Sequence, residues 1–189
     1  MNEEDLIACV RARIVDPKSR IDSRTTGTPR LYGVATPEAL DAAAAEMGVP
    51  LPALLRRLYS EVENGGFGPA TGLIGVSGGH TNIDGESLNA AYTKLRVQGW
   101  PEGILPLCDW GDGAWACVDA RTSDQRIVTM DESGPTQTNF TLRSWLEAWV
   151  SGADLLPETF EIEDGILTNP FTQKPMAVKR RGRARGTRL

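Results

Sequence analysis

The chain has 189 residues and a net charge of −5, and 40% of its residues are hydrophobic. This length fits one domain of ordinary size with a tail, and this composition excludes a disordered or collagen-like chain. No apolar run approaches the roughly 20 residues that cross a bilayer, and the acidic start is unlike a secretory signal, so we expect a cytoplasmic protein without a membrane partner. Cys9, Cys108 and Cys117 fit neither a disulfide framework nor a metal site, so we expect reduced thiols, no metal and no cofactor.

The charge is unevenly distributed along the chain. Residues 179–189 carry six cations and no acid, so the preceding 178 residues have a net charge of −11. We expect residues 179–189 to be a disordered basic tail that aids solubility or folds back on the acidic body. Nucleic-acid binding by this tail is the less favoured alternative, because no aromatic residues lie between its arginines to stack on bases.

The first third of the chain is predicted to be helical. Residues 1–15 have the pattern of a short amphipathic helix, and residues 16–35 form a polar connector. A helix over 37–47 is expected to begin after Thr36 as N-cap and to end at Gly48. A second helix then places its apolar residues on one face: Leu54, Leu55, Leu58, Tyr59 and Val62.

This second helix continues into a glycine-rich segment. The segment reads NGGFGP and includes Asn64, Gly65, Gly66, Gly68 and Pro69. Asn64 and Gly65 are residue types that accept positive φ, so we predict that they stop the helix and reverse the chain. A phosphate-binding loop is the rival interpretation, but such loops precede a helix and this one follows a helix. The glycines have two further uses that the sequence leaves open: close approach to a neighbouring backbone, or adaptation of a binding loop.

The middle of the chain is predicted to contain a buried strand, a loop and a third helix. The apolar run GLIGV at 72–76 is typical of a short strand, and an exposed loop with His80 follows it. The third helix places Leu88 and Tyr92 on one face and ends at Gly99.

The clearest β segment is the hairpin ILPLCDWGDGAWACVDA. Asp112-Gly113, preceded by Gly111, is a favoured two-residue turn. With this turn, Trp110 faces Trp115 and Cys108 faces Cys117 on one side of the hairpin. The opposed cysteines are interpreted as small core residues, because two ligands are too few for a structural zinc site.

The last part of the chain is predicted to contain two strands and a helix. RIVTMDE at 126–132 favours a strand, and TLRSWLEAWVSG favours an amphipathic helix that ends at Gly152 and packs both of its tryptophans on the sheet. A short strand at 159–162 and an extended segment are expected beyond it.

The order and spacing of these motifs resemble a known family. LYSEVENGGFGP, GLIGV, ILPLCDWGDGAWACVD and LRSWLEAWV together are similar to the SMI1/KNR4 family, also called SUKH, over roughly residues 36–151. The resemblance implies an α+β fold with a mostly antiparallel sheet flanked by α-helices. It divides the chain into an N-terminal helix and connector (1–35), the family domain (36–156), an extended segment (157–178) and the basic tail (179–189).

The resemblance also implies a function. Many bacterial members are thought to be immunity proteins that bind a toxin, and fungal relatives regulate wall synthesis through protein contacts. Neither role is catalytic. Bacterial relatives often have a cysteine where this chain has Asp112, which changes the turn and adds a charge there.

We therefore expect a non-catalytic immunity protein that binds and neutralises a cationic toxin, because an acidic body steers a basic partner. The candidate contact residues are Trp100, Asp109, Trp110, Asp112, Glu61 and Glu63. An intracellular adaptor of the same fold without a toxin is the alternative. A hydrolase that uses His80 or clustered carboxylates is the remote one, because the sequence fixes no partner group beside His80.

Overall fold

A computed structural model of the chain describes residues 1–15 and 32–189 and shows an α+β fold, as predicted. The strands are β1 (Ile104–Gly111), β2 (Ala114–Asp119), β3 (Arg126–Asp131), β4 (Gly134–Thr141), β5 (Phe160–Thr168), β6 (Pro175–Ala184) and β7 (Thr187–Arg188). Within the described ranges, five of these form an antiparallel sheet in the order β1-β2-β3-β4-β7. The other two pair as a separate antiparallel hairpin, β5-β6.

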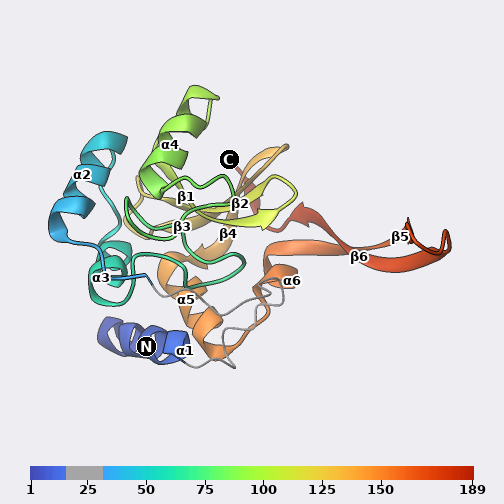
Figure 1. Cartoon of the computed structure of the whole chain (residues 1–189), viewed down its shortest axis with the longest axis horizontal. Helices are drawn as coiled ribbons and strands as arrows, with labels where there is room; N and C mark the ends of the chain where they lie inside the picture. The colour runs from blue at the N-terminus through green and yellow to red at the C-terminus, as the bar shows by residue number, and fades with distance from the viewer. Residues whose placement is uncertain (16–31) are drawn as a thin grey trace.

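The helices pack mainly against one face of the five-stranded sheet (Figure 1). They are α1 (Glu3–Val15), α2 (Pro37–Met47), α3 (Ala53–Glu61), α4 (Leu88–Val97), α5 (Leu142–Ser151) and α6 (Leu155–Thr159). The predicted helix over 37–47 is confirmed with both of its caps. Thr36 Oγ1 accepts a hydrogen bond from the Ala39 amide at 3.2 Å, and Gly48 is left-handed with φ of 66°. Most of the predicted polar connector, residues 16–31, lies outside the described residues.

Two apolar clusters lie on opposite faces of the main sheet, because side chains alternate along each strand. The larger cluster joins the helices to one face, with Tyr59 of α3 and Trp145 of α5 fully buried. The smaller cluster on the other face consists of Ile104, Cys117, Val128 and Met130, with Trp100 and Trp115 packed against it. Trp149 of α5 is only half-buried, in contrast to the deep packing expected for both tryptophans of this helix.

The register of the β1-β2 hairpin differs from the predicted one. Two register shifts, between Pro106 and Cys108 and between Asp109 and Gly111, interrupt the ladder. Each shift changes which residues face one another, so Pro106 pairs with Cys117, and Asp109 with Trp115. The predicted pairs Trp110–Trp115 and Cys108–Cys117 are therefore wrong. In each pair, the first residue belongs to the large cluster and the second to the other face.

Two strand predictions differ from the structure as well. Leu73–Val76 is buried but is not part of a sheet, because its amides donate to scattered acceptors and not to one neighbouring strand. Ile74 N donates to Leu107 O, Gly75 N to His80 O and Val76 N to Asn64 Oδ1. The strand β4 was not expected, because its inward residues Thr136 and Thr138 are polar.

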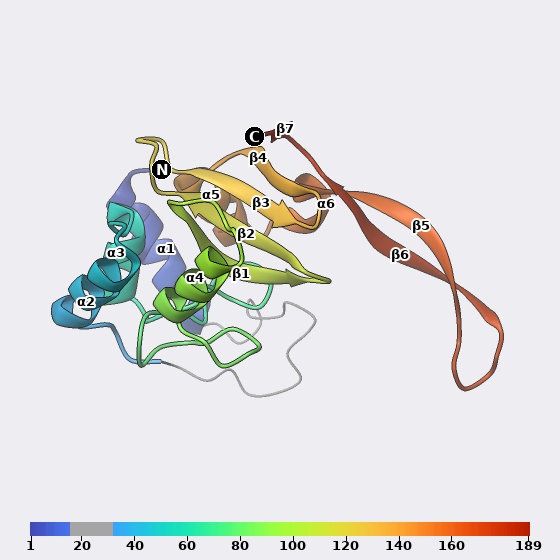
Figure 2. The same ribbon diagram turned by 90° about the horizontal axis from the view of Figure 1, so that it is seen from above.

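The C-terminal residues are not an unstructured tail in this structure. Residues 179–184 complete β6, and residues 187–188 form β7 at the edge of the main sheet, next to β4. Figure 2 shows the β5-β6 hairpin extending away from the rest of the molecule. We call residues 160–185 the arm. Several basic residues expected in a tail therefore lie on β6, where Lys179 forms an ion pair with Asp164 of β5.

Candidate functional site

The glycine-rich segment is fixed by the buried side chain of Asn64. Asn64 Oδ1 accepts a hydrogen bond from Val76 N at 2.9 Å, and Asn64 Nδ2 donates to Val76 O at 3.3 Å. The main-chain oxygen of Asn64 accepts from His80 N at 2.9 Å. One residue thus ties the segment 64–69 to the later segment 73–80 and satisfies three backbone polar groups.

The glycines allow these two segments to pack backbone against backbone. Gly65 has φ of 80°, and a Cβ there would lie 2.5 Å from Leu73 O. A Cβ on Gly75 would lie 2.1 Å from Asn64 O. Real Cβ atoms do not approach that closely, so both positions require glycine. The chain therefore uses this segment for the close approach that the sequence left open, with Gly66, Gly68 and Pro69 completing the turn.

His80 lies beside this segment with both ring nitrogens engaged. Nε2 is 3.1 Å from Thr71 O, a carbonyl that can only accept, so Nε2 carries the proton. Nδ1 then accepts from Tyr32 Oη, 3.2 Å away. Burial lowers the pKa of His80 below its ordinary value, partly offset by the hydrogen bond to Thr71. The neutral imidazole thus has structural partners on both sides.

Two of the six predicted contact residues are not at the surface. Trp110 is 6% exposed and packs edge-on against Phe160, with ring centroids 5.9 Å apart. Glu63 is 1% exposed, and its Oε1 accepts a hydrogen bond from the Tyr32 amide. The expectation that these residues belong to an exposed binding surface is wrong, because Trp110 fills the core and Glu63 holds the backbone of Tyr32.

The other predicted residues lie on separate parts of the fold. Glu61 is exposed at the end of α3 and pairs with Arg57 at 2.7 Å, which lowers the pKa of its carboxyl. Asp112 lies in the β1-β2 turn and Asp109 lies near the end of β1, where its Oδ1 accepts a hydrogen bond from Gly111 N at 2.6 Å. Trp100 lies between α4 and β1.

The turn that carries Asp112 is not a purely acidic surface. Arg181 of β6 donates from Nη2 to the carbonyl oxygens of Gly111 and Asp112, at 3.1 and 3.0 Å. Its guanidinium also lies 4.9 Å from the ring centroid of Phe160. The chain therefore places one of its own cations beside the predicted acidic site.

Trp100 instead forms an aromatic pair with Trp115. Their ring centroids are 6.4 Å apart, with an interplanar angle of 89°, and Trp100 Nε1 donates to Ile104 O at 2.8 Å. Both indoles are half-buried and cover the smaller apolar cluster. We call the surface formed by Trp100 and Trp115, over the buried Cys117, Val128 and Met130, the outer tryptophan face. The predicted register placed Trp115 opposite Trp110, so Trp115 was not recognised as a partner of Trp100. The alternation of AWACV does place Trp115 on the face opposite to Ala114 and Ala116.

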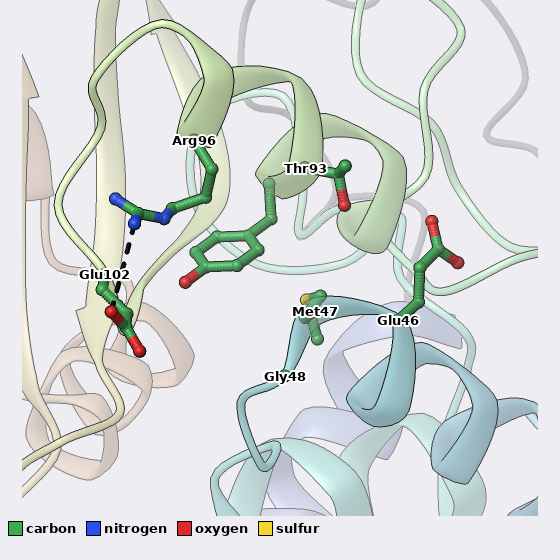
Figure 3. Close-up of a pocket in the computed structure, with 7 residues that line it drawn as sticks. Glu46, Met47, Gly48, Thr93, Arg96 and Glu102 are labelled. Atoms are coloured by element: carbon green, nitrogen blue, oxygen red, sulfur yellow. Dashed lines mark ion pairs between the residues drawn. The ribbon is translucent and has the colours of Figure 1, made fainter.

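A shallow pocket of about 350 Å³ lies between the end of α2 and α4 (Figure 3). Its lining consists of Glu46, Met47, Gly48, Tyr92, Thr93, Arg96 and Glu102. Met47 and Tyr92 are buried, whereas Glu46 and Glu102 are exposed. Arg96 and Glu102 form a long ion pair of 4.0 Å. The pocket thus has a partly apolar lining with two carboxylates at its rim.

Two further properties bear on function. Among residues 1–15 and 32–189, no group of three or more His, Cys, Asp or Glu side chains is arranged to hold a metal ion. In the same ranges, no helix has the length and apolar character that a membrane span requires.

Comparison with known proteins identifies a family. Residues 34–148 match the family model described as SMI1 / KNR4 family (SUKH-1). The match runs from just before α2 into α5 and includes the β1–β4 part of the sheet. It excludes α1 and the arm. No curated protein matches the chain significantly.

Proposed function

The chain belongs to the SMI1/KNR4 (SUKH-1) family, and on that premise we propose that it is a non-catalytic protein-binding module that recognises and neutralises a cationic protein toxin. Membership of this family is compatible with an immunity role. The Trp100–Trp115 pair is the observation on which we base the choice of the outer tryptophan face as the binding surface.

The outer tryptophan face has the composition of a protein-binding centre. Tryptophan is enriched among residues that contribute most to binding, and apolar centres surrounded by polar rims are typical of interfaces. By strand alternation, Asp119 and Arg126 lie on the same face as Trp115 and Val128. They belong to the ion pairs Arg121–Asp119 and Arg126–Asp124, at 2.7 and 2.5 Å. These pairs supply a polar rim of both signs.

The packing of the two indoles favours tight binding. Trp100 is held by its hydrogen bond to Ile104 and by edge-to-face contact with Trp115, so its orientation is set before a partner arrives. A side chain that is already ordered loses less conformational entropy on binding.

The net charge supports a cationic partner. Residues 1–178 carry −11, which raises the rate of encounter with a basic protein. Exposed charges are screened over about 8 Å at physiological salt, so the association rate should fall as salt is added. Replacing Asp109 and Asp112 by Asn should have only a small effect, because Arg181 already lies beside that turn.

The first experiment identifies the partner and its activity. The full chain is purified from its native cell, and the protein that co-purifies is expressed alone and together with the chain. We expect the partner to stop growth when expressed alone, and co-expression of the chain to restore growth. A partner that is harmless when expressed alone would contradict the immunity role and favour an adaptor.

The second experiment tests the surface. Trp100→Ala and Trp115→Ala should each weaken binding of the purified partner by about 30-fold or more, as for central interface tryptophans. Trp149→Ala is the matched control, because Trp149 is also half-buried but lies on α5 against Arg13. Equal losses for all three variants, or no loss at Trp100 and Trp115, would exclude the outer tryptophan face.

A further inference from the structure

We propose that the arm is a dimerisation element, whose apolar tip docks into the pocket between α2 and α4 of a second copy of this chain. This inference does not depend on the identity of the toxin.

The tip of the arm exposes apolar side chains on both faces. The exposed residues are Ile166 (74%), Leu167 (44%), Phe171 (94%) and Met176 (45%). In the register of the hairpin, Leu167 pairs with Met176 and Ile166 with Ala177, so neighbouring pairs point to opposite faces. An isolated two-stranded hairpin is marginally stable in water, so exposed apolar side chains at its tip favour contact with another surface.

Hydrogen bonds order the turn that presents Phe171. Asn169 Oδ1 accepts from the amides of Phe171 and Thr172, at 2.9 and 3.0 Å. Asn169 N donates to Lys174 O at 2.9 Å, which closes the turn. Phe171 is therefore held outward on an ordered turn, which reduces the entropy that docking costs.

The charges of the arm indicate an acidic acceptor. Residues 160–185 contain six cations and three acids, so the arm has a net charge of +3 and the rest of the chain has −8. Opposite charges on two surfaces speed their encounter and fix their orientation. The rest of a second copy has a negative net charge and can therefore attract the positively charged arm.

The pocket between α2 and α4 complements the tip mainly in charge. Met47 and Tyr92 line it, but at 7% and 2% exposure they offer the ring of Phe171 only a small apolar surface. Glu46 and Glu102 at the rim can pair with Lys174, the one charged residue of the segment 165–178.

The position of the arm makes the contact intermolecular. In Figures 1 and 2 the arm projects from the end of the molecule opposite α2, so its tip points away from the pocket of the same chain. Because each copy has one tip and one pocket at opposite ends, two copies related by a two-fold axis can exchange arms. Such a reciprocal contact uses both sites of each copy and closes the assembly.

The test is the mass of the full chain in solution, measured by sedimentation velocity over a concentration series. We expect a dimer, and Phe171→Ser should raise its dissociation constant about 30-fold, as for a central aromatic contact. Val15→Ser is the matched control, because Val15 is a well-exposed apolar residue (67%) at the end of α1. Phe171 is almost fully exposed in the single chain, so its replacement should leave the thermal midpoint unchanged at concentrations where both proteins are monomeric.

Charge-reversal variants test whether the pocket between α2 and α4 is the docking site for the tip. Lys174→Glu and Glu102→Lys should each weaken the dimer, and a mixture of the two single variants should restore it in part through a repaired pair. A monomer at every concentration would overturn the proposal, as would a dimer that tolerates Phe171→Ser. A chain that is monomeric before substitution, and whose Phe171→Ser variant loses toxin binding, would overturn it and assign the arm to the toxin.

Discussion

Asn64 and Gly75 show how single residues determine the shape of the loop region. Asn64 satisfies backbone groups of Val76 and His80, and Gly75 has no side chain to separate its backbone from Asn64. The two residues function only as a pair, because a side chain at Gly75 would occupy the position of the Asn64 main chain. The glycine-rich sequence predicted the turn at Gly65, but it could not predict which distant segment the turn would contact.

A first prediction concerns Gly75. Gly75→Ala should lower the free energy of unfolding by about 3 kcal/mol or more, since its Cβ would lie 2.1 Å from a backbone oxygen that cannot rotate away. Urea denaturation measures this loss. Gly33→Ala is the control, because a Cβ there meets nothing within 4 Å, and it should change the stability by about 0.5 kcal/mol or less. Equal stabilities of the two variants would contradict the close approach.

The candidate contact residues show that the exposure of a single side chain could not be predicted from the sequence. Trp100 and Trp110 were proposed together as contact residues, but Trp100 is half-buried whereas Trp110 is a core residue. Both residues are tryptophans, and the residue type alone does not distinguish a core position from a surface position. The difference arises from Phe160, which is far along the chain and covers Trp110.

Elements with a strong local pattern were predicted well, and those without one were not. The helix 37–47 has caps at both ends, and its bounds were correct. The strand β4 was missed because its buried residues Thr136 and Thr138 are polar, so its sequence shows no apolar alternation. These residues are buried because β4 pairs with β3. The β1-β2 hairpin was located, but its bulges reversed the faces of its side chains, and a sequence pattern carries no signal for such a shift.

A second prediction concerns the start of α5. Thr141 Oγ1 accepts a hydrogen bond from Ser144 N at 3.1 Å, and Ser144 Oγ accepts one from Thr141 N at 3.0 Å. Thr141→Val removes the hydroxyl and should lower the free energy of unfolding by about 1 kcal/mol. Thr141→Ser retains the hydroxyl and should lose much less, as measured by urea denaturation. If Val and Ser at this position gave the same stability, the cap would not contribute.

At the scale of the whole molecule, the arm is joined to the body through Phe160. Phe160 is fully buried, contacts Trp110 in the core and lies under the guanidinium of Arg181. Its main-chain oxygen also accepts from Arg185 Nε at 3.1 Å. The base of the arm is therefore part of the core, whereas its tip is exposed, so the arm is an anchored projection and not a loose tail.

A third prediction follows from this joint. Phe160→Ala should lower the free energy of unfolding by about 3 to 5 kcal/mol, because it empties a core position. Phe160→Leu retains most of the volume and should lose clearly less. Thermal unfolding followed by circular dichroism gives both values. A small effect of the Ala variant would mean that the arm is attached without contributing to the core.

The placement of Cys108 and Cys117 on opposite faces of the main sheet has a further consequence. Both thiols are buried, and burial raises the pKa of Cys117, so neither should react with an alkylating reagent while the sheet is closed. Alkylation of Cys108 then requires separation of the helices from the sheet, whereas alkylation of Cys117 requires only the displacement of Trp115 and its neighbours. The two thiols are thus separate chemical reporters of local opening, and a partner bound over the outer tryptophan face would slow the second reaction and leave the first unchanged.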